Sequence, residues 1–560
     1  MKRIHTLKRT IALFLAMLLA ATSVAFADWD SFQGDDLNNG ASATGVDAKG
    51  NVITADLPNN GATTGLDVEP LIHGSRIYAF HNGGSNGPTV TAISATDGIQ
   101  LWTKSVSGGT KDRVHPENVS QIATPVLSKD GKTLYGVYTY NYDTARVDAF
   151  SEKIPVGKSV TKTFIIDLPH AYNNLQIATG LSNTSWTEGD YEHSLSATAT
   201  IKQGSTEVAD LTGSSYENQG FSLYYGDYSG GIIPAGGYTV EMTVTNNTQD
   251  VVIWTSGGTK AFVNFWQAFK ITNIDTSEPT VAELNAHGYG QASTPLTFQK
   301  NLANENGKLY FGIYDGDRAY YQYDTEHNTA KVFTPAGNDQ FYNAGAVVHA
   351  GKVYFGSESG NVYIQRVDYF NETGGVEQIA DGAIRSSIAL EISTDSAACG
   401  YFTSLNGKLW KVALSGNTVS PIAGLSLGTE AAAAHSTATP TISGNNVYVT
   451  TYGSNPTTWA AIGTVKRVAK NFTAATPITT IYNGDGVQCS PVVYRTGAMD
   501  YVYFTTNVSD GTGYCYRVRS IGGVTPMWNA PSGNYSLQGF AVGSNYMVFG
   551  NDGNALTIVK

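Results

Sequence analysis

The chain has 560 residues and a formal net charge of −12, and only 14% of its residues are charged. Because nucleic acids and anionic lipids repel negative charge, this acidic balance disfavours both as general partners. Glycine and tyrosine are abundant, with 61 and 33 copies, and such a composition favours short strands joined by turns over helices. We therefore expect an all-β protein that does not bind nucleic acid.

Residues 1–27 have the pattern of a cleaved export signal. A basic start precedes the apolar run 11–21, and Ala25-Phe26-Ala27 is a small-x-small cleavage site before Asp28. No Cys stands directly after the cleavage site, so a lipoprotein is not expected. No later apolar run reaches the roughly 18 residues of a transmembrane helix. The sequence predicts an exported protein, extracellular or at the cell surface, with the periplasm as the alternative.

Eight copies of one phrase follow along the chain, most of them about 50 residues apart. Each copy opens with a short motif that is often Ser/Thr-Pro, continues through an apolar run and a turn, and then enters an aromatic-rich run. The copies open at Glu69-Pro70, Thr124-Pro125, Thr294-Pro295, Gly345-Ala346, Ser387-Ile388, Thr439-Pro440, Ser490-Pro491 and Gly539-Phe540. With four antiparallel strands per copy, this period predicts an eight-bladed β-propeller.

The last copy has room for three strands only, near 538–542, 547–549 and 555–559. The strand-like stretch 51–56 precedes the first copy and has no partner of its own. We expect it to supply the fourth strand of the last blade and to close the ring, because an open ring would leave two exposed sheet edges.

One interval is too long, since Pro125 and Pro295 are separated by one repeat plus roughly 120 residues. The excess is rich in alternating apolar and polar runs, which predict a small antiparallel β-sandwich inserted in a hairpin of blade two. The expected domains are therefore the first part of the propeller at 28–144, the inserted sandwich at 145–264, and the remaining propeller at 265–560.

The first repeat contains Ala92-Ile93-Ser94-Ala95-Thr96-Asp97-Gly98-Ile99-Gln100-Leu101-Trp102. This stretch resembles the tryptophan-docking phrase of pyrroloquinoline-quinone-type (quinoprotein-like) propellers, with Ala92, Gly98 and Trp102 as the structural signature. The segment 29–35 resembles the start of many such proteins, and the insert resembles modules of secreted bacterial proteins. The resemblance implies a propeller but no single function, because the same ring serves quinoprotein enzymes and non-catalytic scaffolds.

Motifs for catalysis or metal binding are weak. The quinone dehydrogenases of this type carry an adjacent Cys pair, which this chain lacks, so we expect a member without cofactor. Ser426 stands in a G-x-S-x-G match that lacks the context of a nucleophile elbow. The Asp-Gly turns at Asp315 and Asp485 read as hairpins rather than calcium sites, although a structural Ca²⁺ stays conceivable. Cys489 and Cys515 fall in one repeat, either as a disulfide or as buried thiols. We therefore predict no catalytic residue and no metal ligand.

The aromatic residues of the insert are the candidate binding residues. Flat rings beside polar groups hold sugars by stacking and hydrogen bonds, whereas ordinary core packing would explain the same rings without a ligand. The predicted contacts are Trp186, Tyr224, Tyr225 and Tyr228.

The function that fits these features is an exported, non-catalytic scaffold or binding protein that recognises a protein or glycan of the cell envelope. Two alternatives stay open at this point. One is a dehydrogenase that depends on quinone and calcium, and the other is a periplasmic assembly factor that binds exported proteins.

Overall fold

The structure, a computed structural model, describes residues 29–560 with gaps at 35–36, 39, 47–50, 59–67, 107–118, 169–173, 183–194, 214–221, 226–232, 248–250, 301–306, 373, 395–396, 429–434, 456, 459, 508–512, 522–527, 532–538 and 552. The predicted signal peptide lies outside these residues. The described chain is all-β apart from the short 3-10 turns η1 (Phe32–Gly34), η2 (Gly84–Asn86) and η3 (Ala336–Asn338). In this part of the chain, no helix is long and apolar enough to cross a membrane.

Each sequence repeat forms one antiparallel sheet, and the sheets are numbered here by repeat. Sheet 1 consists of β3 (Leu71–His73), β4 (Arg76–Asn82), β5 (Pro88–Ser94) and β6 (Gln100–Ser105), and sheet 2 of β7 (Val119–Ile122), β8 (Val126–Leu127), β9 (Thr133–Ile154), β16 (Val252–Thr272) and β17 (Thr280–Tyr289). Sheet 3 consists of β18 (Gln291–Ala292), β19 (Thr297–Lys300), β20 (Gly307–Tyr314), β21 (Tyr320–Asp324) and β22 (Thr329–Phe333). Sheet 4 consists of β23 (Val347–His349), β24 (Lys352–Gly356), β25 (Asn361–Arg366) and β26 (Gly375–Gln378).

Sheets 5 to 8 repeat the pattern. Sheet 5 consists of β27 (Ala389–Thr394), β28 (Ala397–Ser404), β29 (Lys408–Ser415) and β30 (Thr418–Ser426), and sheet 6 of β31 (Thr441–Ser443), β32 (Asn446–Ser454), β33 (Ala461–Ala469) and β34 (Thr479–Gly484). Sheet 7 consists of β35 (Val492–Thr496), β36 (Met499–Asn507), β37 (Gly513–Arg519) and β38 (Trp528–Pro531), with β1 (Ala41–Ser42) parallel to β35. Sheet 8 consists of β39 (Phe540–Val542), β40 (Met547–Gly550), β41 (Ala555–Val559) and β2 (Val52–Asp56).

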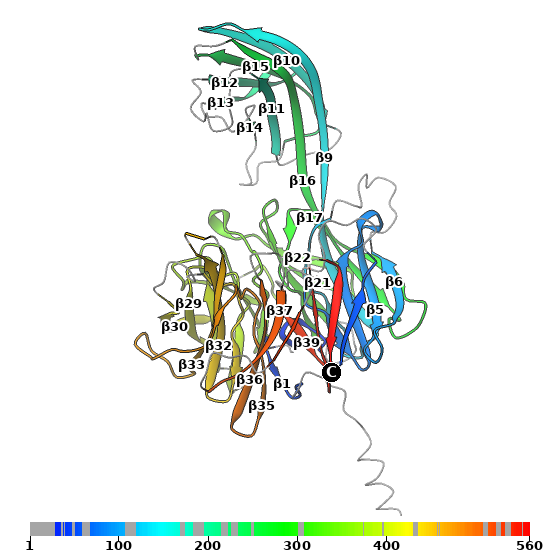
Figure 1. The fold of residues 1–560 in the computed structure, drawn as a ribbon, viewed down its shortest axis with the longest axis vertical. Coiled ribbons are helices and arrows are strands. Elements are labelled where there is room, and N and C mark those ends of the chain that lie inside the picture. The colour runs from blue at the N-terminus through cyan, green and yellow to red at the C-terminus, as the bar shows by residue number, and fades with distance from the viewer. Residues whose placement is uncertain are drawn as a thin grey trace, which may run out of the picture.

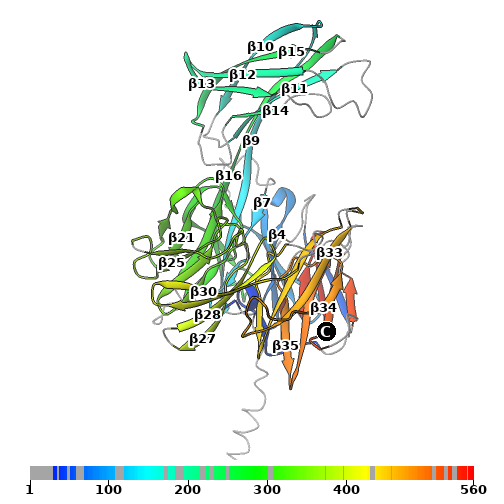
Figure 2. The ribbon, with the colours of Figure 1, turned by 90° about the vertical axis from the view of Figure 1, so that its left-hand side faces the viewer.

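The sheets lie together in one body (Figures 1 and 2). Neighbouring sheets share clusters of buried apolar side chains. One buried cluster joins the last sheet to the first two, because it contains Ile558 of sheet 8, Ile77 of sheet 1 and Ile271 of sheet 2. A series of four-stranded sheets in which the last packs against the first is consistent with a β-propeller.

The strand β2 pairs antiparallel with β41, in the register Val52↔Val559 to Asp56↔Ala555. This is the pairing predicted for the stretch 51–56. Ala55 faces the core and is buried, whereas Thr54 on the other side of the strand is exposed. The N-terminal strand therefore completes the sheet that begins with the last repeat.

The segment 29–46 crosses from sheet to sheet before β2 begins. Its contacts tie together parts of the chain that are hundreds of residues apart in sequence. They join Trp29 to Ile72 in sheet 1, Leu37 to Leu390 in sheet 5, Gly40 to Val493 in sheet 7, and Thr44 to Gly543 in sheet 8.

Sheet 2 differs from the others because β9 and β16 are about three times longer than ordinary strands, with 22 and 21 residues. Their outer ends are extended by β11 (Asn174–Ser182) and β14 (Ser222–Tyr225). A separate sheet of β10 (Lys158–Leu168), β15 (Gly236–Asn246), β12 (Leu195–Gln203) and β13 (Thr206–Gly213) packs on this extension. We call these outer strands the strand-borne module (Figure 1).

The module has its own core. Burial in β10 alternates with period two, so that Phe164 and Ile166 point inward while Ile165 is 60% exposed. The inward side chains meet Trp254 of β16 in a cluster that contains no residue of the other seven sheets. Because β9 and β16 run unbroken through residues 145 and 264, the predicted domain boundaries fall inside strands rather than at linkers.

Candidate functional site

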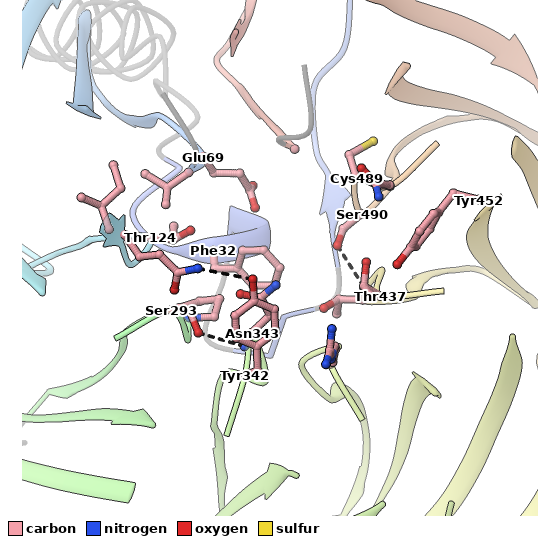
Figure 3. A pocket seen from close by; sticks show the side chains of 18 residues that line it. Phe32, Glu69, Thr124, Ser293, Tyr342, Asn343, Thr437, Tyr452, Cys489 and Ser490 are labelled. Carbon is pink, nitrogen blue, oxygen red and sulfur yellow. Dashed lines mark hydrogen bonds between the residues drawn. The ribbon is translucent and has the colours of Figure 1, made fainter. Parts of the chain in front are cut away.

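A cavity of about 470 Å³ lies where the eight sheets meet. Most of its wall comes from segments next to the first strand of each sheet, and Tyr452 of β32 and Phe32 of the N-terminal segment complete it (Figure 3). The lining residues are Phe32, Val68, Glu69, Gln121, Ile122, Thr124, Ser293, Pro295, Tyr342, Asn343, Arg385, Thr437, Thr439, Tyr452, Gln488, Cys489, Ser490 and Gly539.

Hydroxyl groups of the repeat phrase link neighbouring sheets around this cavity. The backbone N–H of Gly345 donates to Ser387 Oγ (3.0 Å), that of Ser387 to Thr439 Oγ1 (2.9 Å), and that of Thr439 to Ser490 Oγ (2.9 Å). Each bond satisfies a buried N–H that β pairing leaves free. This explains why Ser or Thr recurs at the start of the phrase.

The pattern of Ser and Thr hydroxyl groups at the start of the repeat phrase is interrupted at Glu69 and Gly539. Glu69 occupies the Ser/Thr position of the first repeat, and its side chain is 2% exposed. A Cβ atom on Gly539 would lie 2.8 Å from Glu69 Cδ, so the glycine leaves the space that the larger acid fills. Sheets 8 and 1 therefore meet at a carboxyl group, whereas the three junctions between sheets 4 and 7 use a hydroxyl.

The Glu69 carboxyl group is uncharged at neutral pH. Burial raises its pKa to about 8, against the opposing effect of the Trp29 indole N–H, which donates to Glu69 Oε1 (3.4 Å). Its other oxygen, Oε2, has no hydrogen-bond partner among the described residues. Burial similarly raises the pKa of the neighbouring Cys489 thiol to about 11, so this side of the cavity is neutral.

The positive charge of the cavity wall is Arg385, and it is already paired. Its guanidinium makes three hydrogen bonds to the Glu358 carboxylate, at 2.9, 3.1 and 2.6 Å, and lies 4.8 Å from the centre of the Tyr342 ring. The Tyr342 hydroxyl in turn accepts a hydrogen bond from Gln121 Nε2 (3.4 Å), while Gln121 Oε1 is buried without a partner in the described chain.

Of the four predicted contact residues, the structure describes the backbone of two and the side chain of none. Trp186 and Tyr228 lie outside the described residues. Tyr224 and Tyr225 lie in β14, where their backbones pair with Gln176 and Leu175, but their side chains are also outside the described part.

The signature residues of the first repeat lie at a contact between sheets. Ala92 is buried, and Trp102 Nε1 donates to the Ile274 carbonyl oxygen that follows β16 (3.1 Å). Gly98 has a φ of 75°, and a Cβ atom there would lie 2.7 Å from Ile53 of β2. The phrase thus holds sheet 1 against sheets 2 and 8.

The other motifs have local roles. The Ser426 hydroxyl donates to the Gly428 carbonyl oxygen at the end of β30. Asp315 has a φ of 61° and its carbonyl oxygen accepts from the Arg318 N–H, as in a turn, and the Asp485 N–H donates to the Tyr482 hydroxyl. Cys489 and Cys515 are free, buried thiols. No group of three or more His, Cys, Asp or Glu side chains that could hold a metal occurs in the described ranges.

Sequence reasoning missed Glu69 and Arg385. The available signal for Glu69 was its place in the repeat, because an acidic residue stands where the other copies have Ser, Thr or Gly. Arg385 carries no such signal. Its position became apparent only when the fold brought it next to Glu358 and Tyr342.

A quinone and a calcium ion, as in the quinoprotein enzymes, would make specific demands on the wall of this cavity. A quinone with several carboxylates needs several free cations, whereas the described wall offers Arg385, whose charge Glu358 balances. Calcium needs six to eight oxygen ligands with carboxylates among them, and Glu69 is the single carboxyl group in the described wall. These residues do not fit the pair.

No protein-family model and no curated protein sequence matches this chain. Several solved structures resemble it in part. A europium-containing methanol dehydrogenase is 9% identical, with 93% of this chain and 87% of that chain covered and a TM-score of 0.42. The computationally designed Ika8 protein is 10% identical, with coverage of 90% and 98% and a TM-score of 0.40. BamB from Moraxella catarrhalis is 13% identical, with coverage of 52% and 88% and a TM-score of 0.32. Likenesses of this size carry no argument about activity.

Proposed function

We propose that this chain is an exported, non-catalytic binding protein of the bacterial cell surface or the surrounding medium. In this proposal the eight sheets are the blades of an eight-bladed β-propeller closed by β2. Residues 145–264 form a β-sandwich domain inserted in blade two, and this domain recognises a protein or glycan of the cell envelope. The ring acts as a rigid platform and needs no cofactor.

The observation that carries the proposal is the pair of long strands β9 and β16. Their pairing runs from Thr133↔Thr272 to Ile154↔Val252, a distance of about 70 Å at the usual rise of a strand. Two continuous paired strands resist bending more than a loop linker does. They hold the module, with its separate core, away from the other seven sheets (Figure 2).

A separate core at the end of a stiff arm has no evident role in stabilising the ring, because the ring completes its own core without it. Functional residues often lie on such projecting segments of a rigid scaffold. The aromatic residues Trp186, Tyr224, Tyr225 and Tyr228 are the proposed contacts, by stacking on a sugar or an apolar peptide side chain.

The first test is binding of the full chain to two immobilised fractions, cell-wall polysaccharide and detergent-solubilised envelope protein. We expect one fraction to retain the wild type and the variant Tyr224→Ala/Tyr225→Ala to bind at least tenfold more weakly. The control Tyr369→Ala removes a ring that is 47% exposed on sheet 4 and should bind as the wild type does. Both variants are checked for an unchanged melting temperature.

The opposing outcome is enzymatic turnover. Pyrroloquinoline quinone and Ca²⁺ are added to the wild type with an alcohol and a reducible dye. We expect no dye reduction above the rate without protein. Sustained reduction that depends on the protein would contradict a non-catalytic role, and unchanged binding by the double aromatic variant would move recognition away from these rings.

A further inference from the structure

The cavity among the eight sheets has features of a ligand site that structural packing alone does not require. Its volume of about 470 Å³ lies within the usual range of small-molecule sites. Its wall contains two polar atoms, Glu69 Oε2 and Gln121 Oε1, that are buried without hydrogen-bond partners in the described chain. Buried polar atoms normally have partners, and a small rotation of either side chain toward the cavity would let an occupant supply one.

The wall is polar but close to neutral. Arg385 is balanced by Glu358 through three hydrogen bonds. The remaining polar wall consists mainly of amide and hydroxyl groups, such as those of Gln121, Thr437 and Gln488. In the described part of the wall, a strongly charged ligand would therefore meet no unpaired opposite charge.

Amides and hydroxyls both donate and accept hydrogen bonds. A matching ligand carries groups of the same dual character on several edges, because the wall surrounds the cavity. Aromatic side chains also line it: Phe32 from the N-terminal segment, Tyr342 before sheet 4, and Tyr452 of sheet 6 (Figure 3). A sugar ring combines hydroxyl edges with an apolar face that stacks on such rings.

We propose that this cavity binds an uncharged sugar of one or two rings, with Gln121, Tyr342 and Glu69 as hydrogen-bonding contacts and aromatic side chains against the ring face. A peptide is the competing class of ligand, and the comparison with a tripeptide below distinguishes the two. The site is independent of the proposed recognition by the module.

The hydrogen-bonded pair of Gln121 and Tyr342 provides the test. Gln121→Leu keeps the size of the side chain and removes its amide, so we expect at least a tenfold loss of sugar affinity. Tyr342→Phe removes one hydroxyl and should weaken binding by a smaller factor. The matched control Gln100→Leu changes an exposed glutamine of β6 and should leave the affinity unchanged.

The probes are glucose, galactose, N-acetylglucosamine, maltose and cellobiose, with glucuronate and a neutral tripeptide as comparison ligands. Binding to the full chain is measured by calorimetry and by ligand-observed NMR, up to about 10 mM, which is ten times the dissociation constant of ~1 mM expected for a small ligand. Saturable binding of a neutral sugar that Gln121→Leu weakens and Gln100→Leu does not would support the site.

Three outcomes would overturn it. They are no binding of any neutral sugar, tighter binding of glucuronate or the tripeptide, and sugar binding that Gln121→Leu and Tyr342→Phe both leave intact. If Gln121→Leu fails to fold, Tyr342→Phe alone decides. Loss of sugar binding in Tyr224→Ala/Tyr225→Ala, with Gln121→Leu unaffected, would place the sugar on the module. That result would refute the cavity site while leaving the proposed function standing.

Discussion

The buried carboxyl group of Glu69 makes a specific prediction about stability and pH. Its pKa is about 8 in the folded protein and 4.5 as an ordinary side chain. Between these values the unfolded chain releases the proton while the folded chain keeps it. The contribution of this group to the free energy of unfolding is therefore fully present below pH 4.5 and is lost as the pH rises toward 8. The difference of pKa corresponds to about 5 kcal/mol.

Glu69→Gln isolates this effect, because an amide has nearly the shape of the protonated acid and does not ionise. We expect the variant and the wild type to have similar free energies of unfolding at pH 4. The variant should gain relative stability with rising pH, up to about 5 kcal/mol near pH 8.

The assay is urea denaturation of both proteins at intervals from pH 4 to pH 9. The control Glu278→Gln changes an acid whose side chain is 87% exposed, at a distance of 3.7 Å from Lys104 Nζ, and should show no comparable trend. Parallel curves for Glu69→Gln and the wild type between pH 5 and pH 8 would refute the assignment of Glu69 as a buried, neutral acid.

Three further predictions concern the ring. Burial lowers the pKa of His81 from 6.5 to about 4. The free energy of unfolding should therefore fall by about 3 kcal/mol as the pH drops through this range. In His81→Gln, urea denaturation over the same pH range should show a smaller fall. Thr439→Val removes the acceptor of the Ser387 N–H and should lower the free energy of unfolding by about 1–3 kcal/mol in urea denaturation. Thr439→Ser keeps the acceptor and should lower it less. Equal losses of stability would contradict the role of the hydroxyl. Ala55→Asp places a charge in the core behind β2 and should lower the free energy of unfolding by about 3 kcal/mol or more, measured in thermal melts. Thr54→Asp on the exposed side of β2 should have little effect. Similar melting temperatures for the two variants would argue against β2 as part of the core.

The repeat phrase made most strands predictable from sequence, because each copy carries its own alternating pattern and turn. The pairing of 51–56 with the last repeat followed from a count of strands and is confirmed by the register of β2 and β41. The reason for the recurring Ser and Thr was not visible in the sequence, because their hydrogen bonds join residues about 50 positions apart, such as Ser387 and Thr439.

The cavity was beyond sequence reasoning for the same physical reason. Its wall combines one or a few residues from each of eight sheets with Phe32, and no local pattern marks such a set. The crossing of the segment 29–46 under these sheets depends on single contacts, for example Thr44 to Gly543, that leave no periodic signal. The length of β9 and β16 was also missed, because a polar stretch at Asn141–Thr144 looks like a turn in sequence yet pairs with β16 in the structure.

The central claim is that the strand-borne module, and not the ring, recognises the envelope partner. Residues Ile154 and Val252 face each other across β9 and β16, so a two-residue Asn-Gly turn can replace residues 155–251 and close a plain hairpin. The decisive measurement is the dissociation constant of this shortened protein for the fraction that retains the wild type, after its melting temperature shows an intact ring. We expect the dissociation constant of the shortened protein to be at least a hundredfold higher than that of the wild type. A shortened, folded protein that binds as tightly as the wild type would contradict it.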